Sequence, residues 1–169
     1  MGGTLYGDLF INNFADLDPG PGLLDWDCTG FTYNGHDASD VDLRSFGEQA
    51  IGVPVFAALD GTVVATHDGE FDMNVCPGSP CNPNSNYVII DHGSGRLCYY
   101  WHLKQWSVAV SPGEQVVTGQ QIGLAASSGN SSQTGPGAGV LACCRPGDAD
   151  SDEDSDLADF AALQLAFAE

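Results

Sequence analysis

Short apolar runs separated by glycine-rich turns dominate the chain from Val53 onward. Residues 53–59 and 62–67 flank Asp60-Gly61, a dipeptide typical of tight two-residue hairpin turns. Residues 86–91 and 96–103 flank the turn-forming segment 92–95, which predicts a second hairpin. With 22 glycines and nine prolines in the chain, this pattern predicts a mainly β fold, namely a compact antiparallel β-sandwich or barrel.

The pattern changes near Cys143. Residues 148–169 contain eight acidic residues and no basic ones, and apolar residues then recur at the spacing of a helix. We therefore predict a β domain over residues 1–142, followed by a short acidic loop-helix appendage over residues 143–169.

The charge balance narrows the classes of partner. The formal net charge is −19, from four Lys and Arg against 23 Asp and Glu. Four cations cannot line a groove for a polyanion, which argues against a nucleic-acid partner. Divalent cations are the small partners that this charge favours.

The six cysteines indicate an oxidising compartment. Cys76 and Cys81 bracket a short loop of turn formers, so we predict a local disulfide between them. A metal clip is the less favoured alternative, and the pairing of the other four stays open (Cys28, Cys98, Cys143, Cys144). No apolar run reaches transmembrane length. No signal peptide is visible, but the cysteines favour a secreted or cell-envelope location.

Three residues are candidates for a zinc site. His36 and Asp40 are four residues apart, and His102 follows a predicted strand. A hydrolytic zinc needs about three protein ligands and an open position for water. Spacing alone favours ordinary surface or structural roles for all three. The same holds for His67, which we expect to be solvated, and for His92, which we expect to serve a turn.

The order of segments carries more information than any single motif. Six segments follow one another in an order that closely resembles the lysostaphin-like zinc endopeptidases, which cut peptide cross-links of bacterial cell walls: Tyr33–Asp42, Pro54–Val63, Asn86–Gly93, Tyr100–Leu103, Val110–Gly123 and Ser127–Ser131. The resemblance covers roughly residues 28–136. It implies the β-sandwich called the duplicated hybrid motif, a metallopeptidase (hydrolase) activity on peptidoglycan peptides, zinc ligands at His36 and Asp40, and a catalytic role for His102.

The sequence departs from this family at the motif that supplies the third zinc ligand. The family ends its site with two histidines in an H-x-H motif, and Gly137 and Gly139 stand at those positions here. We therefore expect zinc binding to be weak or absent and catalysis to be impaired or lost. The alternative is a non-catalytic peptidoglycan-binding or partner-activating pseudoenzyme. Val140-Leu141-Ala142 is a candidate replacement for the altered strand. A biotinyl or lipoyl carrier is rejected, because Lys104 is the only lysine and lacks the carrier pattern.

The acidic tail resembles one half of a dockerin-type repeat. Alternating carboxylates supply the oxygen ligands that a calcium loop requires, and six residues are candidates: Asp148, Asp150, Asp152, Asp154, Asp156 and Asp159. Glu153 stands where the repeat has glycine, and Ser155 where it has an apolar residue. The resemblance implies weak calcium binding and a cohesin-like partner. A solvated acidic tail is the equally weighted alternative.

Overall fold

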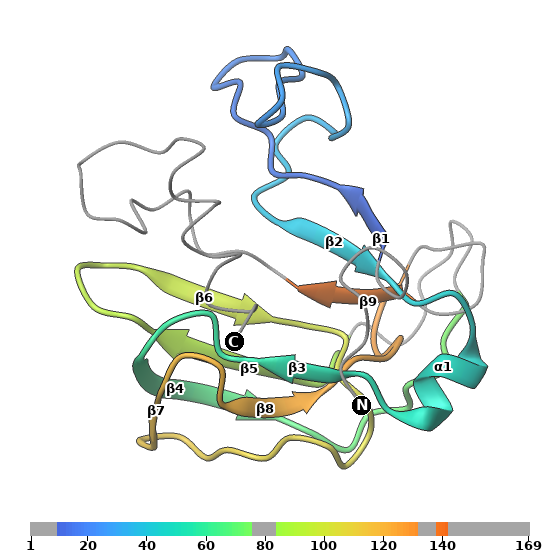
Figure 1. Cartoon of the computed structure of the whole chain (residues 1–169), viewed down its shortest axis with the longest axis vertical. Coiled ribbons are helices and arrows are strands. Elements are labelled where there is room, and N and C mark those ends of the chain that lie inside the picture. Colours follow the sequence, from blue (N-terminus) through green and yellow to red (C-terminus); the bar gives the residue numbers. More distant parts are fainter. Residues whose placement is uncertain (1–9, 76–83, 132–137, 142–169) are drawn as a thin grey trace.

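The fold is taken from a computed structural model, which describes residues 10–75, 84–131 and 138–141 (Figure 1). Cys76 and Cys81, Gly137 and all six predicted calcium ligands lie outside the described residues, so these predictions stay predictions. Within the described ranges, Cys28 is an exposed free thiol, and Cys98 is buried and disulfide-bonded. None of the helices in these ranges has the length and apolar character needed to cross a membrane.

The strands form three antiparallel sheets, which confirms the mainly β prediction. The largest has the order β6-β5-β4-β7, with β4 at Gly61–His67, β5 at Tyr87–Asp91, β6 at Leu97–Tyr100 and β7 at Gln115–Val116. A second sheet pairs β3 (Pro54–Phe56) with β8 (Gln121–Leu124). The third has the order β1-β2-β9, formed by Phe10–Asn13, Ser39–Asp42 and Ala138–Leu141.

One hydrophobic core joins the two-stranded and four-stranded sheets, which overlap in the view of Figure 1. Val88 and Ile90 alternate along β5 and are completely buried, as expected for the inward face of a strand. Ile122 of β8 packs in the same cluster. The Tyr100 hydroxyl of β6 accepts the Ala58 N–H at 2.9 Å, which adds a polar tie after β3.

The hairpin predicted around Asp60-Gly61 is wrong, although β3 and β4 form close to the expected residues. β3 pairs with β8, and β4 pairs with β5 and β7. Neither Asp60 nor Gly61 has the positive φ that a type I′ turn requires. The chain instead turns away after β3, because Ala57 bonds to the segment before β8: it donates to Gln120 and accepts from Gly119, both at 2.9 Å.

The second predicted hairpin is confirmed. β5 and β6 pair antiparallel with Ile89 opposite Tyr99. The connecting turn contains three consecutive residues of positive φ, namely Gly93, Ser94 and Gly95. This left-handed backbone explains the glycines in the turn. The strand ends at Tyr100, which leaves His102 in the segment directly beyond it.

One short helix, α1 (Phe46–Ile51), was not predicted. Its sequence signal is a capping box: the Ser45 hydroxyl accepts the Glu48 N–H at 3.2 Å. Lys104 donates from Nζ to the Gln49 carbonyl at 2.9 Å near the other end of this helix. The lysine therefore has a structural role, consistent with rejection of the carrier hypothesis.

Two residues of the predicted replacement strand, Val140 and Leu141, lie in β9, whereas Ala142 lies outside the described residues. β9 pairs antiparallel with β2 and also contacts β6. In this register Val140 lies opposite Asp40, and Gly139 lies opposite Val41. Residues paired across an antiparallel ladder share a face of the sheet. Position 140, and not position 139, therefore lies on the face of Asp40.

Candidate functional site

The two predicted zinc ligands come together at β2. His36 is only 6% exposed, and its Nε2 lies 3.4 Å from Asp40 Oδ2. The imidazole packs against the Tyr33 ring with the centroids 4.1 Å apart. The Asn13 amide donates to the same Asp40 oxygen at 3.3 Å. His36 and Asp40, which the sequence related only by their four-residue spacing, therefore lie in contact beside β1.

Two carboxylates shape the loop that presents His36. Asp16 donates its N–H to the His36 carbonyl at 2.6 Å and accepts the Gly35 N–H on Oδ2 at 2.9 Å. That Gly35 N–H is the main reason why the pKa of Asp16 is lowered. The buried Asp25 carboxylate accepts the Thr29 N–H at 2.7 Å. These acidic residues organise the backbone, as side-chain caps of turns commonly do.

The donors at this site fit a hydrolytic zinc only in part. His36 Nε2 is buried and makes no hydrogen bond within the described residues, and a metal would satisfy such an orphaned nitrogen. Yet no group of three or more His, Cys, Asp or Glu side chains is arranged to hold a metal in the described ranges. A catalytic zinc with three protein ligands therefore does not fit this part of the chain.

His102 occupies a constrained position just after β6. Its φ is +59°, in the left-handed region that residues other than glycine adopt rarely. Its N–H donates to Ser85 Oγ at 3.0 Å, and its Nδ1 lies 2.5 Å from the Ser128 carbonyl oxygen. A carbonyl oxygen only accepts hydrogen bonds, so Nδ1 carries the proton and Nε2 keeps its lone pair.

Burial favours the neutral form of this imidazole. It lowers the pKa of His102 below its ordinary value, and the Ser128 carbonyl and the Asp40 charge oppose that shift only in part. Asp40 is thus close enough to influence the pKa of His102. A neutral histidine with a free Nε2 can accept a proton or bind a metal.

A second carboxyl, Asp42, lies two residues beyond Asp40 on the same strand, and the sequence analysis missed it. Burial first, and the Asp40 charge second, raise the pKa of Asp42 to about 6. The same two causes raise the pKa of Tyr33. Alternation along a strand puts residues 40 and 42 on one face, and this two-residue spacing was a signal available in the sequence.

A groove of about 550 Å³ runs beside His102. Aromatic, amide and hydroxyl side chains line it, together with two histidines: His67, Asn84, Ser85, Tyr87, Trp101, His102 and Asn130. Neither His36 nor Asp40 is among the lining residues. Trp101 is 44% exposed beside the histidine. The groove therefore offers aromatic side chains and hydrogen-bonding groups to a ligand.

The two remaining histidines differ from each other. The His92 ring does not contact the turn that follows it: its Nδ1 lies 2.8 Å from the carbonyl oxygen of Asp60, between β3 and β4. Only the backbone of His92 closes its own turn, through its N–H to the Arg96 carbonyl at 2.9 Å. His67 is not simply solvated. Its Nε2 lies 2.9 Å from Glu70 Oε1, and its ring stacks on Tyr87 with centroids 5.8 Å apart. His67 is therefore an oriented residue of the groove wall, which no spacing motif indicated.

The sequence matches Peptidase family M23 over residues 41–139. The chain belongs to this family. The match begins directly after Asp40 and includes His102 and Gly139. The predicted resemblance to a peptidase family is therefore confirmed at the level of M23.

A curated relative is the peptidoglycan DD-endopeptidase ShyA of Vibrio cholerae serotype O1 (strain ATCC 39315 / El Tor Inaba N16961). It is 35% identical to this chain over 86 residues, which are 51% of this chain and 16% of that protein. The match therefore spans only a small part of that relative's length.

Two solved structures are similar to this chain, with low sequence identities and TM-scores below 0.5. A zinc containing peptidase from Vibrio cholerae is 25% identical with a TM-score of 0.46, covering 80% of this chain and 37% of its own. LytU is 18% identical with a TM-score of 0.46, covering 86% of this chain and 79% of its own. Family membership rests on the sequence match and not on these similarities.

Proposed function

We propose that this M23 domain binds peptidoglycan peptides in the cell envelope or outside the cell, and that its zinc-dependent hydrolysis of cross-links is impaired or lost. The observation that carries the proposal is the ligand set. His36 and Asp40 lie 3.4 Å apart, but the described residues bring no third ligand to them. The name of the relative, a peptidoglycan DD-endopeptidase, supports peptidoglycan as the ligand class.

The expected loss of zinc affinity is large. Removing a partner that only orients a metal ligand typically costs about 10–100-fold in metal affinity or activity. Loss of a direct ligand removes a bond to the metal itself, so we expect a loss of at least about 100-fold. Without a firmly held zinc, no bound water is acidified toward neutrality for attack on a peptide.

The direct test combines metal content with activity. The purified chain is analysed for zinc by mass spectrometry and assayed for lysis of peptidoglycan, with and without a chelator. The proposal predicts zinc well below one per chain and lysis no faster than in the absence of protein. Stoichiometric zinc, together with lysis that the chelator abolishes, would refute it.

Restoring a ligand tests the same idea in the opposite direction. The register places position 140 across from Asp40 and position 139 across from Val41. We therefore expect Val140→His to raise zinc affinity by at least about tenfold and Gly139→His to raise it less, because paired positions share a face. Equal zinc affinities in both variants and in the unmodified chain would contradict the proposed gap.

A non-catalytic binding role is the second candidate, and the groove is the observation that favours it. The chain would be mixed with insoluble peptidoglycan, and the fraction that sediments would be measured. Trp101→Ala, in the groove wall, is expected to reduce binding. Trp106→Ala is the matched control, since Trp106 is 76% exposed and is not among the lining residues. Equal loss of binding in both variants would argue against the groove as the binding site.

The tail carries two further predictions that the structure does not test. Weak calcium binding by the carboxylates of residues 148–159, and a cohesin-like partner, follow only from the sequence resemblance. Calcium titration of the full chain, followed by circular dichroism and calorimetry, tests the first. Unchanged signals would favour the solvated acidic tail.

A further inference from the structure

The conformation of His102 needs an explanation beyond its own side chain. A left-handed φ costs a residue other than glycine about 1–2 kcal/mol. Such strained residues persist where their surroundings hold them in several ways at once. The segment around His102 is held in this manner by Ser85, Asn86 and Ser128, three residues to which the sequence assigned no role of their own.

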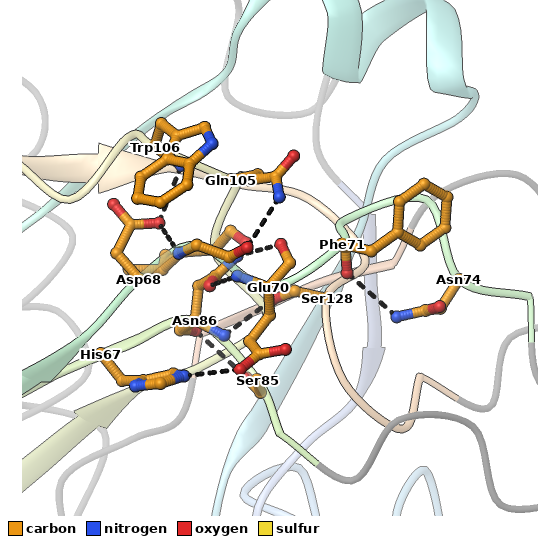
Figure 2. Close-up of polar contacts among 12 residues, drawn as sticks. His67, Asp68, Glu70, Phe71, Asn74, Ser85, Asn86, Gln105, Trp106 and Ser128 are labelled. Carbon is orange, nitrogen blue, oxygen red and sulfur yellow. Dashed lines mark hydrogen bonds and ion pairs between the residues drawn. The ribbon is translucent and has the colours of Figure 1, made fainter.

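Asn86 is the centre of this network and is completely buried. It makes two hydrogen bonds to the backbone of Leu103, the residue after His102. The Asn86 carbonyl accepts the Leu103 N–H at 3.1 Å, and Asn86 Nδ2 donates to the Leu103 carbonyl at 3.0 Å. The same amide exchanges hydrogen bonds with the Glu70 backbone, donating at 3.0 Å and accepting at 2.8 Å. Figure 2 shows Asn86 close to Glu70, Ser85 and Ser128.

Two serines connect Asn86 to His102 itself. The Ser85 hydroxyl donates to the Asn86 carbonyl at 3.1 Å and accepts the His102 N–H at 3.0 Å. The Asn86 N–H donates to Ser128 Oγ at 3.0 Å, and the carbonyl of Ser128 contacts His102 Nδ1. The backbone and the imidazole of His102 are thus both tied to one buried asparagine.

We propose that Asn86 is a positioning residue, which acts through Ser85 and Ser128 to fix the left-handed backbone of His102 and to hold its imidazole with the proton on Nδ1. This leaves the Nε2 lone pair available at the groove. The inference rests on the proposed role of His102 in an M23 site. Its test does not depend on zinc or lysis, so the two ideas can fail separately.

The experiment is ¹⁵N NMR of the full chain with labelled histidines, near neutral pH and without metal. It reads which ring nitrogen of His102 is protonated and how fast the Nδ1 proton exchanges with water. Asn86→Asp replaces the donor amide with a carboxylate of the same shape. Gln49→Glu is the matched control, because Gln49 is also a buried amide, and its side chain donates to the Asp72 carbonyl and not to any atom of His102, Ser85 or Ser128.

A second pair keeps the test decisive if Asn86→Asp does not fold. Ser128→Ala removes the acceptor of the Asn86 N–H. Ser127→Ala removes a neighbouring buried hydroxyl that donates to the Asn74 carbonyl instead. We expect Nδ1 proton exchange in Ser128→Ala to be about fivefold faster than in Ser127→Ala, the effect of one lost buried hydrogen bond.

The proposal predicts a growing fraction of the Nε2-protonated form in Asn86→Asp and Ser128→Ala. Two results would overturn it. One is the unmodified tautomer and exchange rate in a folded Asn86→Asp or Ser128→Ala variant. The other is an equal change in the controls, which would indicate general loosening of the core and not positioning of His102.

Discussion

Gly129 lies where the loop after β8 packs against the segment that holds His102, and it provides a quantitative test of that packing. Its φ is +75°, and a Cβ atom there would lie 2.6 Å from Ser85 Cβ and 3.0 Å from Ser85 Cα. Gly119 has nearly the same φ, +78°, but a Cβ atom there would meet nothing within 4 Å. Alanine substitutions at Gly129 and Gly119 therefore share the cost of backbone strain, and only the one at Gly129 adds a steric clash.

Alanine at either position should lose about 1–2 kcal/mol of folding free energy through the left-handed backbone. Gly129→Ala must also displace Ser85, and overpacking of this kind typically costs about 1–3 kcal/mol more. For a chain of this length the difference corresponds to a melting temperature about 2–12 °C lower than that of Gly119→Ala.

Urea and thermal unfolding of the two variants and the unmodified chain measure this difference. The displaced Ser85 hydroxyl should also leave the His102 N–H without its acceptor, so the His102 amide should exchange faster in Gly129→Ala than in Gly119→Ala. Equal unfolding free energies for the two alanine variants would refute the assigned contact between this loop and Ser85.

Three further predictions concern single residues. His102→Gly should be about 1 kcal/mol more stable than His102→Ala, because glycine relieves the positive φ; equal stability in urea would argue against backbone strain. In metal-free buffer, Asp42→Asn should be about 1 kcal/mol more stable than the unmodified chain above pH 6, a figure that allows for solvent screening of this half-buried carboxyl. The folded pKa of about 6 lies above the ordinary 3.8, so the gain should shrink as pH falls from 6 and vanish below 3.8; a gain that is independent of pH would contradict the assignment. Lys104→Met should lose about 0.3–1 kcal/mol through its contact with the end of α1, and the loss should shrink in high salt; the same urea midpoint for both proteins would show that the contact is unimportant.

Local sequence signals predicted part of the fold well. The alternation of buried residues along β5 and the glycines of the turn at residues 92–95 specify their hairpin without distant information. The turn at Asp60-Gly61 carries an equally strong local signal, but Ala57 accepts a hydrogen bond from Gly119 and donates one to Gln120, which directs β3 to another sheet. Sequence alone does not reveal such distant partners. The short helix α1 did have a readable signal in its capping box.

The candidate site, like the fold, was only partly predictable from the sequence. The order of segments singled out His36, Asp40 and His102 as candidates, and the structure brings His36 and Asp40 into contact. The functional roles of all three residues stay predictions. The residues that hold His102 come from three segments far apart in the chain, and they have no periodicity or fixed spacing. Burial and hydrogen bonding reveal Asn86, whereas its sequence context resembles an ordinary strand start.

Zinc stoichiometry tests the central claim most directly. The full chain and a His36→Ala variant would be gel-filtered in zinc-free buffer after saturation with zinc, and the metal per chain would be measured by mass spectrometry. An incomplete ligand set predicts well under one zinc per chain in both proteins, with no difference between them. One zinc per chain that His36→Ala removes would contradict the account and show that the chain completes its site with another ligand.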